Sequence, residues 1–269
     1  NFQRFGLKKL ISTSFAADSK NFKTVYQPTL FEEESPQFDK KKTKVRGKIF
    51  VLDHDANKNG KIDIEDLEWK YLEGDGDFRS EEVKRLRDEA DIIVTNPPFS
   101  LFREFLAWIL EGRDSHAENA EVAEKKFLII GNMNAITYKE VFPLIKDNKM
   151  WLGESIHSGD RKFWVPDSYE LNAAGCGIDE TGRKYIRVKG VRWFTNLDYT
   201  KRHEDIITYR MFATDNYPKY DNYDAIHVKK TEDIPCDYNG LMGVPITFLD
   251  KYNPEQFEIL GMTDRDSPL

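Results

Sequence analysis

The chain has 269 residues, of which 39% are hydrophobic and 32% are charged, so it can build one large folded domain or two modest ones. This composition excludes a globally disordered protein, and no apolar run approaches the roughly 20 residues of a membrane-spanning helix, so no membrane partner is expected. The net charge of −7 argues against binding nucleic acid by bulk charge alone, although a local basic patch can still bind it. The two cysteines, Cys176 and Cys236, lie far apart, which argues against a disulfide framework or zinc cluster and fits a cytoplasmic protein.

The first half of the chain predicts strands and helices in alternation. Short apolar or β-branched runs predict strands, which cover residues 10–14, 44–52, 90–95 and 127–130. Residues 32–42 are polar and predict a loop. Helices are predicted over 81–89 with Ser80 as the cap, from Ser100 onward, and over 138–146. The helix after Ser100 has an apolar face made of Leu101, Phe102, Phe105, Leu106 and Ile109.

This alternation predicts a doubly wound, Rossmann-like α/β sheet, in which residues 90–95 form a buried parallel strand. In such sheets, ligands bind beyond the carboxyl ends of the strands, and an Asn-Pro-Pro-Phe segment follows one of these ends. After about residue 150, short aromatic runs alternate with Gly, Asp and Pro turns. We therefore predict an α/β core over residues 1–150 and a β-rich region over residues 151–269.

Residues 55–66 have the spacing of an EF-hand-like calcium loop, closest to the dockerin type, inserted into the core near residues 53–68. Gly60 makes the sharp turn at the sixth position of the loop. The predicted oxygen ligands are Asp55, Asn57, Asn59, the backbone carbonyl of Lys61, Asp63 and Asp66. The final ligand is Asp rather than Glu, which predicts a structural calcium ion of modest affinity. The competing interpretation is a polar turn held by its own Asn and Asp side chains.

The segment Asn96-Pro97-Pro98-Phe99 is the strongest candidate for chemistry. An exocyclic amine on an aromatic ring is a poor nucleophile because its lone pair is delocalised into the ring. The side-chain carbonyl of Asn96 and the main-chain carbonyl of Pro97 can accept the amino hydrogens and direct the lone pair at a methyl donor, while the prolines fix these acceptors. Phe99 can stack on a base flipped out of the duplex. The segment predicts an amino-methyltransferase with Asn96, Pro97, Pro98 and Phe99 as catalytic residues.

This motif also has a simpler interpretation, an ordinary turn that ends a strand and packs its phenylalanine. By itself it does not separate adenine, cytosine and protein glutamine as methyl acceptors. Upstream, Gly74-Asp75-Gly76-Asp77-Phe78 precedes another predicted helix at the same expected sheet edge. Asp77 there could accept a hydrogen bond from an adenine amino group, and Phe78 could pack on the ring. The competing interpretation is a Gly-Asp turn with a core phenylalanine.

Several stretches together resemble the EcoRI-type adenine-specific DNA methyltransferase family, and the resemblance covers nearly the whole chain. The N-terminal stretches are GDGDFRSEE, ADIIVTNPPFSLFREF and KFLIIGNMNAITYKEVFPLIKDNKMWLG. The C-terminal stretches are WFTNLD, KRHE, YPKYDNYDAI and MGVPITFLDKYNPEQFEILG.

The resemblance implies S-adenosylmethionine as the methyl donor, double-stranded DNA as the substrate and N6 of adenine as the acceptor. It matches Asn96 to Phe99 to the catalytic tetrapeptide of the family, and Asp77 and Phe78 to the segment beside the adenine of the cofactor. It also implies a restriction–modification setting, with a cognate restriction endonuclease as a candidate partner. The first cofactor-binding strand of the family falls upstream of Asn1, so we expect a sheet that lacks its first strand.

Two basic clusters are candidates for DNA contacts. The first contains Lys40, Lys41, Lys42, Lys44, Arg46 and Lys48. The second contains Arg183, Lys184, Arg187, Lys189, Arg192, Lys201 and Arg202, interleaved with Tyr185, Trp193, Phe194 and Tyr199. The second cluster is the better candidate because aromatic side chains accompany its charges and could contribute to base reading. Solvated strand faces are the competing interpretation.

The sequence leaves two other functions open. One is amino methylation of a different acceptor, such as cytosine N4 or adenine in RNA, which nucleoside analysis of the product would distinguish. The other is a catalytically silent, truncated DNA-binding remnant stabilised by calcium, which the upstream position of the first cofactor strand favours. Calorimetric titration with S-adenosylmethionine separates the enzyme from the silent protein.

Overall fold

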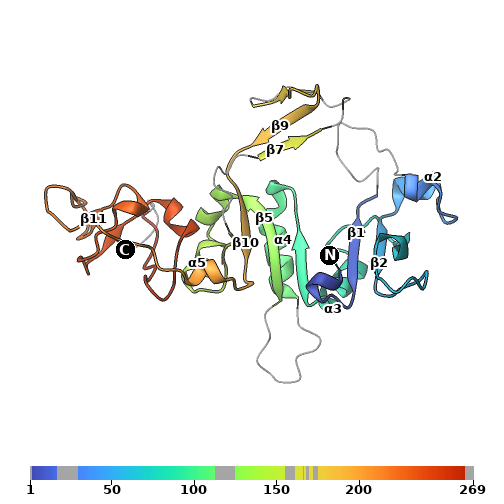
Figure 1. The fold of residues 1–269 in the computed structure, drawn as a ribbon, viewed down its shortest axis with the longest axis horizontal. Helices are drawn as coiled ribbons and strands as arrows, with labels where there is room; N and C mark the ends of the chain where they lie inside the picture. Colours follow the sequence, from blue (N-terminus) through green and yellow to red (C-terminus); the bar gives the residue numbers. More distant parts are fainter. Residues whose placement is uncertain are drawn as a thin grey trace, which may run out of the picture. The chain divides into compact units, whose positions relative to one another are not determined.

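The computed structural model describes residues 2–16, 30–112, 125–154, 161–165, 167, 170–171 and 175–263. Contacts between residues divide the chain into two compact units, which are described separately (Figure 1). Unit 1 comprises Asn1–Ala90, Gly112–Val122 and Trp164–Ile186, and unit 2 comprises Asp91–Glu111, Ala123–Phe163 and Arg187–Leu269. Among the described residues, no helix has both the length and the apolar character required to cross a bilayer.

Unit 1 contains an antiparallel sheet of three strands with β2 in the middle. The strands are β1 (Leu10–Ser14), β2 (Lys48–Leu52) and β3 (Glu68–Tyr71). Lys48 is buried at the start of β2, where its ammonium lies 2.5 Å from the carboxylate of Glu32 and 5.3 Å from the ring centre of Trp69. Burial of this charge is tolerated because a carboxylate and an aromatic face accompany it.

The helices of unit 1 begin at capping residues that the sequence supplies. These helices are α1 (Leu30–Glu33), α2 (Lys40–Val45) and α3 (Glu81–Glu89), with 3₁₀ turns η1 (Gln3–Phe5) and η2 (Ile64–Asp66). The carboxylate of Asp39 accepts from the backbone N–H groups of Lys41 and Lys42 and so starts α2. Ser80 accepts from the N–H of Val83 at the start of α3, and the acidic Glu81 and Glu82 favour the positive end of the helix.

The Gly74–Phe78 segment passes very close to the ends of two strands. A Cβ atom on Gly47 would lie 2.7 Å from both Cα of Gly76 and the carbonyl oxygen of Ser14. Gly76 has φ +87°, a conformation that favours glycine. Backbone hydrogen bonds connect Ala16 to Asp75 at 2.7 Å and Gly47 to Gly74 at 2.9 Å. Backbone hydrogen bonds and close backbone packing therefore fix the turn before Asp77 against β1 and β2.

Unit 2 contains a mixed sheet of four strands in the order β4, β5, β10, β6. The strands are β4 (Ile92–Thr95), β5 (Lys126–Asn132), β6 (Trp151–Leu152) and β10 (Val191–Thr195). β4 and β5 are parallel, with Thr95 opposite Ile129, and β10 is antiparallel to both β5 and β6. The helical segments beside this sheet are η3 (Phe99–Leu101), α4 (Phe102–Glu111), η4 (Met133–Thr137) and α5 (Phe142–Lys146).

The C-terminal part of unit 2 has its own small hydrophobic core. Its regular elements are β11 (Ile226–His227), β12 (Met242–Gly243), η5 (Thr200–His203), η6 (Thr231–Asp233) and η7 (Ile246–Asp250). The buried cluster consists of Tyr217, Ile226, Val228, Ile234 and Phe248. A further sheet, most of whose residues belong to unit 1, has the order β7 (Arg161–Trp164), β9 (Lys184–Val188), β8 (Gly177–Ile178).

Several sequence predictions are confirmed, while others are wrong in detail. The strand at 10–14, the helix at 81–89 and the parallel strand before Asn96 are present. The predicted loop at 32–42 instead contains part of α1 and the start of α2, and the strand predicted from residue 44 begins at Lys48. The reason is the Asp39 cap, which turns the alternating basic residues into a short helix.

The prediction of a buried strand at 90–95 is also wrong. Side chains of β4 are substantially exposed, 48% for Ile92 and 66% for Val94, because β4 lies at the edge of the described sheet. The mixed α/β class is confirmed, but a doubly wound Rossmann-like arrangement is not. Among the described strands, only β4–β5 and the short β11–β12 pair are parallel elements, and β1 pairs antiparallel with β2.

Candidate active site

The Asn96–Phe99 segment forms a sharp connection between β4 and α4. β4 ends at Thr95, and Pro98 has φ −53° and ψ 134° as it caps the short turn η3. The N–H of Leu101 donates to the carbonyl of Pro98 at 2.8 Å, and α4 follows from Phe102. Asn96 is exposed, Pro97 is buried and Phe99 is half-buried. The proline rings thus fix a turn that leaves the asparagine side chain accessible.

The side-chain oxygen of Asn96 and the main-chain carbonyl of Pro97 are the two acceptors that the sequence predicts. Among the described residues, neither the side chain of Asn96 nor the carbonyl of Pro97 has a hydrogen-bond partner in the protein. The next residues explain why, since prolines have no N–H to donate locally. The exposed side chain of Asn96 directly after β4 therefore keeps its acceptor capacity for a ligand, whereas Pro97 beside it is buried.

The start of α4 is held in place by a close aromatic contact. Phe102 is 1% exposed, and its ring centre lies 5.0 Å from that of Phe194 on β10. Gly131 on β5 provides the space, because a Cβ there would lie 2.5 Å from the Phe102 ring and 2.8 Å from the Phe194 ring. Leu106 and Ile109 continue the buried face, as predicted from their spacing. The turn before α4 is therefore attached to a rigid part of unit 2.

The carboxyl end of β5 adds polar groups that the sequence interpretation did not single out. Asn132 accepts from the N–H of Asn134 at 2.9 Å and donates to the carbonyl of Lys189 at 3.1 Å. Asn134 is exposed. Because β4 and β5 are parallel, their carboxyl ends lie at the same edge of the sheet. The signal that could have found them is an apolar run followed by Gly-Asn-Met-Asn.

The predicted cofactor residues Asp77 and Phe78 belong to unit 1, whereas Asn96–Phe99 belong to unit 2. The carboxylate of Asp77 accepts from the backbone N–H of Arg79 at 2.8 Å and from its guanidinium at 2.9 and 2.6 Å. These bonds, above all the one from the Arg79 side chain, lower the pKa of Asp77. Phe78 is 4% exposed, and the guanidinium of Arg79 lies 5.2 Å from its ring centre. Both residues are well fixed, and their contact with a cofactor stays a prediction.

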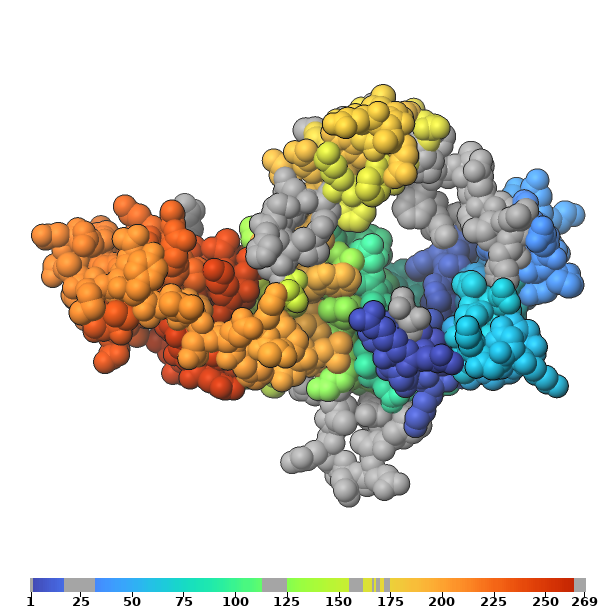
Figure 2. All heavy atoms as spheres, viewed as in Figure 1, coloured from blue at the N-terminus to red at the C-terminus, as the bar shows by residue number. Residues whose placement is uncertain are grey.

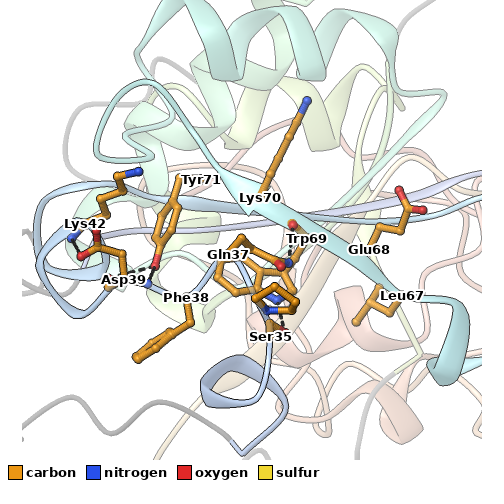
Figure 3. A pocket seen from close by; sticks show the side chains of 11 residues that line it. Ser35, Gln37, Phe38, Asp39, Lys42, Leu67, Glu68, Trp69, Lys70 and Tyr71 are labelled. Atoms are coloured by element: carbon orange, nitrogen blue, oxygen red, sulfur yellow. Dashed lines mark hydrogen bonds between the residues drawn. The ribbon is translucent and has the colours of Figure 1, made fainter.

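A hollow in unit 1 contains none of the predicted site residues. It has a volume of about 800 Å³ and is lined by residues 35–39, Lys42 and residues 67–71 (Figure 3). Its polar groups bond to each other across the hollow. Trp69 donates to Ser35 at 2.9 Å, and Gln37 donates to the carbonyl of Trp69 at 3.0 Å. The 35–39 segment thereby covers the outer edge of β3, which gives the hollow a structural explanation.

The structure does not support the predicted calcium site at Asp55–Asp66. No group of three or more His, Cys, Asp or Glu side chains that could hold a metal occurs in the described ranges. Backbone N–H groups of the loop instead donate hydrogen bonds to the side-chain oxygens that would bind the metal. Asp55 accepts from Asn59 and Gly60, and the buried Asp66 accepts from Ala56, Asn57 and Asp63. The side-chain oxygen of Asn57 accepts from the N–H of Asn59, and that of Asn59 accepts from the N–H of Lys61. The carboxylate of Asp63 accepts from the N–H of Glu65. The competing interpretation, a turn held by its own side chains, fits these contacts.

The second basic cluster divides into two groups. Three of its members serve internal contacts of unit 2. Arg192 makes a paired contact with Asp250 at 2.9 and 3.2 Å, and Lys201 pairs with Glu154. Arg202 is buried, with its guanidinium 3.8 Å from the ring centre of Trp151. The remaining members, Arg183, Lys184, Arg187 and Lys189, lie on or beside β9.

Comparison with known proteins identifies the class of enzyme. Residues 1–267 match the family described as adenine-specific methyltransferase EcoRI. The chain is 44% identical to the type II methyltransferase M.EcoRI of Escherichia coli, over 99% of this chain and 74% of that enzyme. It is 38% and 37% identical to the type II methyltransferases M.MgeORF184P of Mycoplasma genitalium and M.MpnI of Mycoplasma pneumoniae. The chain belongs to the EcoRI family of adenine-specific DNA methyltransferases.

The resemblance inferred from the motifs is therefore confirmed, as is the enzyme class. The two mycoplasma alignments cover 70% of this chain and 57% of each relative, so the chain spans less than two thirds of their length. No solved structure matches the chain significantly. Membership in a methyltransferase family implies the use of S-adenosylmethionine and action on DNA.

Proposed function

We propose that the enzyme transfers the methyl group of S-adenosylmethionine to N6 of adenine in double-stranded DNA, with the target base flipped onto the Asn96–Phe99 turn. The observation that carries this proposal is that the described part of the chain gives no hydrogen-bond donor to the side-chain oxygen of Asn96 or to the carbonyl of Pro97. They follow β4 at the edge of the sheet where α/β proteins bind their ligands. Family membership supplies the adenine preference.

In this mechanism Asn96 and Pro97 each accept one hydrogen of the adenine amino group. The nitrogen then becomes more tetrahedral, and its lone pair points out of the ring plane toward the methyl donor. The rigid turn makes this arrangement available without ordering at the moment of reaction. The half-buried Phe99 offers one ring face on which the flipped base can stack. No strong base is required, because the amine loses its proton readily once it is methylated.

S-adenosylmethionine, when bound, supplies an electrophilic methyl group on a sulfonium. We assign Asp77 as an acceptor for the adenine amino group of the cofactor and Phe78 as the apolar support of that segment. One oxygen of Asp77, Oδ2, accepts a single hydrogen bond from Arg79 and so keeps capacity for another donor. The fixed turn at Gly76 would hold this carboxylate in position.

Product analysis tests the proposal directly. The full chain is incubated with S-adenosylmethionine and duplex DNA, and the DNA is digested to nucleosides and separated by mass. We expect N6-methyladenine. N4-methylcytosine, or methylation of RNA in preference to duplex DNA, would contradict the adenine-DNA assignment. Calorimetric titration of S-adenosylmethionine into wild type and Asp77→Ala tests the cofactor role, with weaker binding expected in the variant.

The cellular setting follows from the same proposal. We place the enzyme in the cytoplasm, together with its DNA substrate, where two free cysteines are stable. A cognate restriction endonuclease that cuts the unmethylated site is the expected partner activity. The division into a catalytic core over residues 1–150 and a target-recognition region over residues 151–269 also remains part of this proposal. Protection of methylated DNA from host endonuclease digestion would test the pairing.

A further inference from the structure

The β7, β9, β8 sheet carries an exposed tryptophan supported by a network of polar contacts. The side chain of Trp164 at the end of β7 is 58% exposed. Its indole N–H donates to Asp179 at 2.8 Å, and the guanidinium of Arg183 lies 4.6 Å from its ring centre. This distance is typical of a cation–π contact. An exposed aromatic ring that is held from two sides has a defined orientation toward solvent.

The turn that connects β8 and β9 is fixed by the same aspartate. Asp179 accepts from the N–H and hydroxyl of Thr181 at 2.9 and 2.6 Å, and from the N–H of Arg183 at 2.9 Å. Gly182 has φ +80°, which completes the reversal. These donors, led by the Thr181 hydroxyl, keep the pKa of Asp179 far below its usual value. The ionised carboxylate of Asp179 therefore stabilises the turn through these hydrogen bonds.

Alternation along β9 places the arginines on one face. Gly177 pairs with Tyr185, and a Cβ on Gly177 would contact the Tyr185 ring, so both lie on the same face of the sheet. Side chains two residues apart in a strand share a face, which adds Arg187 to that of Tyr185. Arg183 directly precedes β9, and the hydrogen bond from the N–H of Asp179 to its carbonyl at 2.9 Å continues the pairing of β8 with β9, so the same alternation extends to Arg183. Both arginines are exposed. Trp164 joins this face through its contacts with Arg183 and Asp179.

We propose that this face, defined by Trp164, Arg183, Tyr185 and Arg187, is a DNA-binding surface whose two arginines neutralise phosphates of the duplex. The inference rests on the proposed function and deepens it, because it names which part of the second basic cluster reaches the substrate. Atoms of the strands β7 and β9 are visible in yellow and gold at the surface in Figure 2.

Exposed guanidinium groups favour duplex DNA as the partner. The chain as a whole has a net charge of −7, yet this face presents two exposed arginines beside the ionised Asp179, whose carboxylate accepts from Thr181 and Arg183 of the turn. Guanidinium groups donate to phosphate oxygens, and contacts of this kind fix the position of a protein on the duplex. A rigid turn also reduces the entropy lost on binding. Three other members of the cluster, Arg192, Lys201 and Arg202, are engaged with side chains of unit 2, and Lys184 donates to the carbonyl of Asp167.

The test is the salt dependence of DNA binding by the full chain. Affinity for a fluorescent duplex of random sequence is measured between roughly 50 and 200 mM salt. Each lost phosphate contact should reduce the slope of log affinity against log salt by about 0.9. We expect this reduction for Arg187→Ala and about twice as much for the Arg183→Ala/Arg187→Ala double variant. Arg187→Lys keeps the charge and should restore the slope.

Lys61→Ala is the matched control, because Lys61 is also exposed and basic but lies in the Asp55–Asp66 loop. Its slope should equal that of wild type. Circular dichroism verifies that each variant is folded, and Arg187→Ala leaves the Trp164–Arg183 contact intact. An unchanged slope in the folded double variant would overturn the inference, as would an equal reduction in Lys61→Ala. If wild type forms N6-methyladenine while the double variant binds DNA normally, only this inference fails. If wild type neither methylates nor binds the duplex, the proposed function fails with it.

Discussion

The Asn96–Phe99 turn and the Asp55–Asp66 loop are both short polar segments rich in oxygen acceptors, but the protein uses those acceptors in opposite ways. In the loop, backbone N–H groups of the same segment occupy the side-chain oxygens. In the turn, the acceptors of Asn96 and Pro97 have no protein partner among the described residues. The difference comes from the neighbours. Glycine and asparagine turns present N–H donors inward, whereas consecutive prolines present none.

A row of Asp and Asn residues is therefore not by itself a ligand site. Such residues become available to a ligand only where the local backbone cannot satisfy them. The same contrast separates Arg183 and Arg187 from Arg192 and Arg202 in the second basic cluster. The former remain exposed, whereas the latter contact Asp250 and Trp151. Substitutions can test this distinction between polar groups that are bonded within the protein and those that are free to contact a ligand.

The largest effect is expected for Asn96→Ala. Removing one of two acceptors that orient the amine should slow methyl transfer by about a hundredfold to a thousandfold, the range for loss of one transition-state hydrogen bond. DNA affinity should stay nearly unchanged. Transfer of labelled methyl groups at saturating DNA and cofactor measures the rate. Asn57→Ala is the control, since the Asn57 oxygen accepts from the backbone of Asn59, and it should methylate like wild type. Equal rates in wild type and Asn96→Ala would refute the mechanism.

The next effect concerns the anchoring of the turn. Gly131→Ala introduces a Cβ only 2.5 Å from the Phe102 ring, so the packing at the start of α4 must shift. Overpacking of this kind should lower the free energy of unfolding by about 1–3 kcal/mol, measured by urea denaturation. Gly74→Ala is the matched control, because no atom lies within 4 Å of a Cβ there. Gly131→Ala and Gly74→Ala with the same stability would show that the Phe102 contact does not constrain the turn.

Asp66→Asn tests the loop. Asp66 is 2% exposed, and backbone N–H groups, chiefly that of Asp63, lower its pKa. A lowered pKa gives stability that is present above about pH 4 and lost as the pH falls through the folded value. The melting temperature of the variant should therefore lie below that of wild type at neutral pH, and the gap should narrow in acid. A loop held by its own hydrogen bonds also predicts that wild type has the same melting temperature in calcium and in chelator. A lower melting temperature in chelator would restore the calcium interpretation.

The smallest effect is expected at His203, which joins two acidic side chains in the C-terminal part of unit 2. Its ring nitrogens lie 2.8 Å from Asp198 and 2.8 Å from Glu255, and these bonds raise its pKa. A raised pKa gives stability that is complete below about pH 6.5 and lost as the pH rises through the folded value. His203→Gln should melt below wild type at pH 6, with a gap that closes toward alkaline pH. A gap that is constant with pH would mean that the charge of His203 does not contribute.

Much of the fold near the proposed site follows from local sequence. The Ser80 cap, the acidic first turn of α3 and the spacing of Phe102, Leu106 and Ile109 are short-range signals, and the structure contains each element. The prolines that end β4 are equally local. The Asp77–Arg79 pair was also predictable, because the two residues are two positions apart.

Other features depend on contacts between distant residues and could not be predicted. The β-branched run of β4 does not reveal that Ile92 and Val94 are exposed at a sheet edge. The charge of Arg192 does not indicate that its partner is Asp250, which is 58 residues away in the chain. The alternation of residues 44–52 predicted a longer strand, because the effect of Asp39 on α2 competes with that pattern.

The crossing of Gly47 and Gly76 beside Ser14 has a practical consequence for engineering. Any side chain at either glycine would meet backbone atoms at about 2.6–2.8 Å, and backbone cannot rotate aside as a flexible side chain can. On the proposed cofactor role of Asp77, libraries aimed at accepting altered methyl donors should therefore keep both glycines fixed. The positions to vary are Gly74, where a new side chain has open space, and the exposed Glu73 beside it.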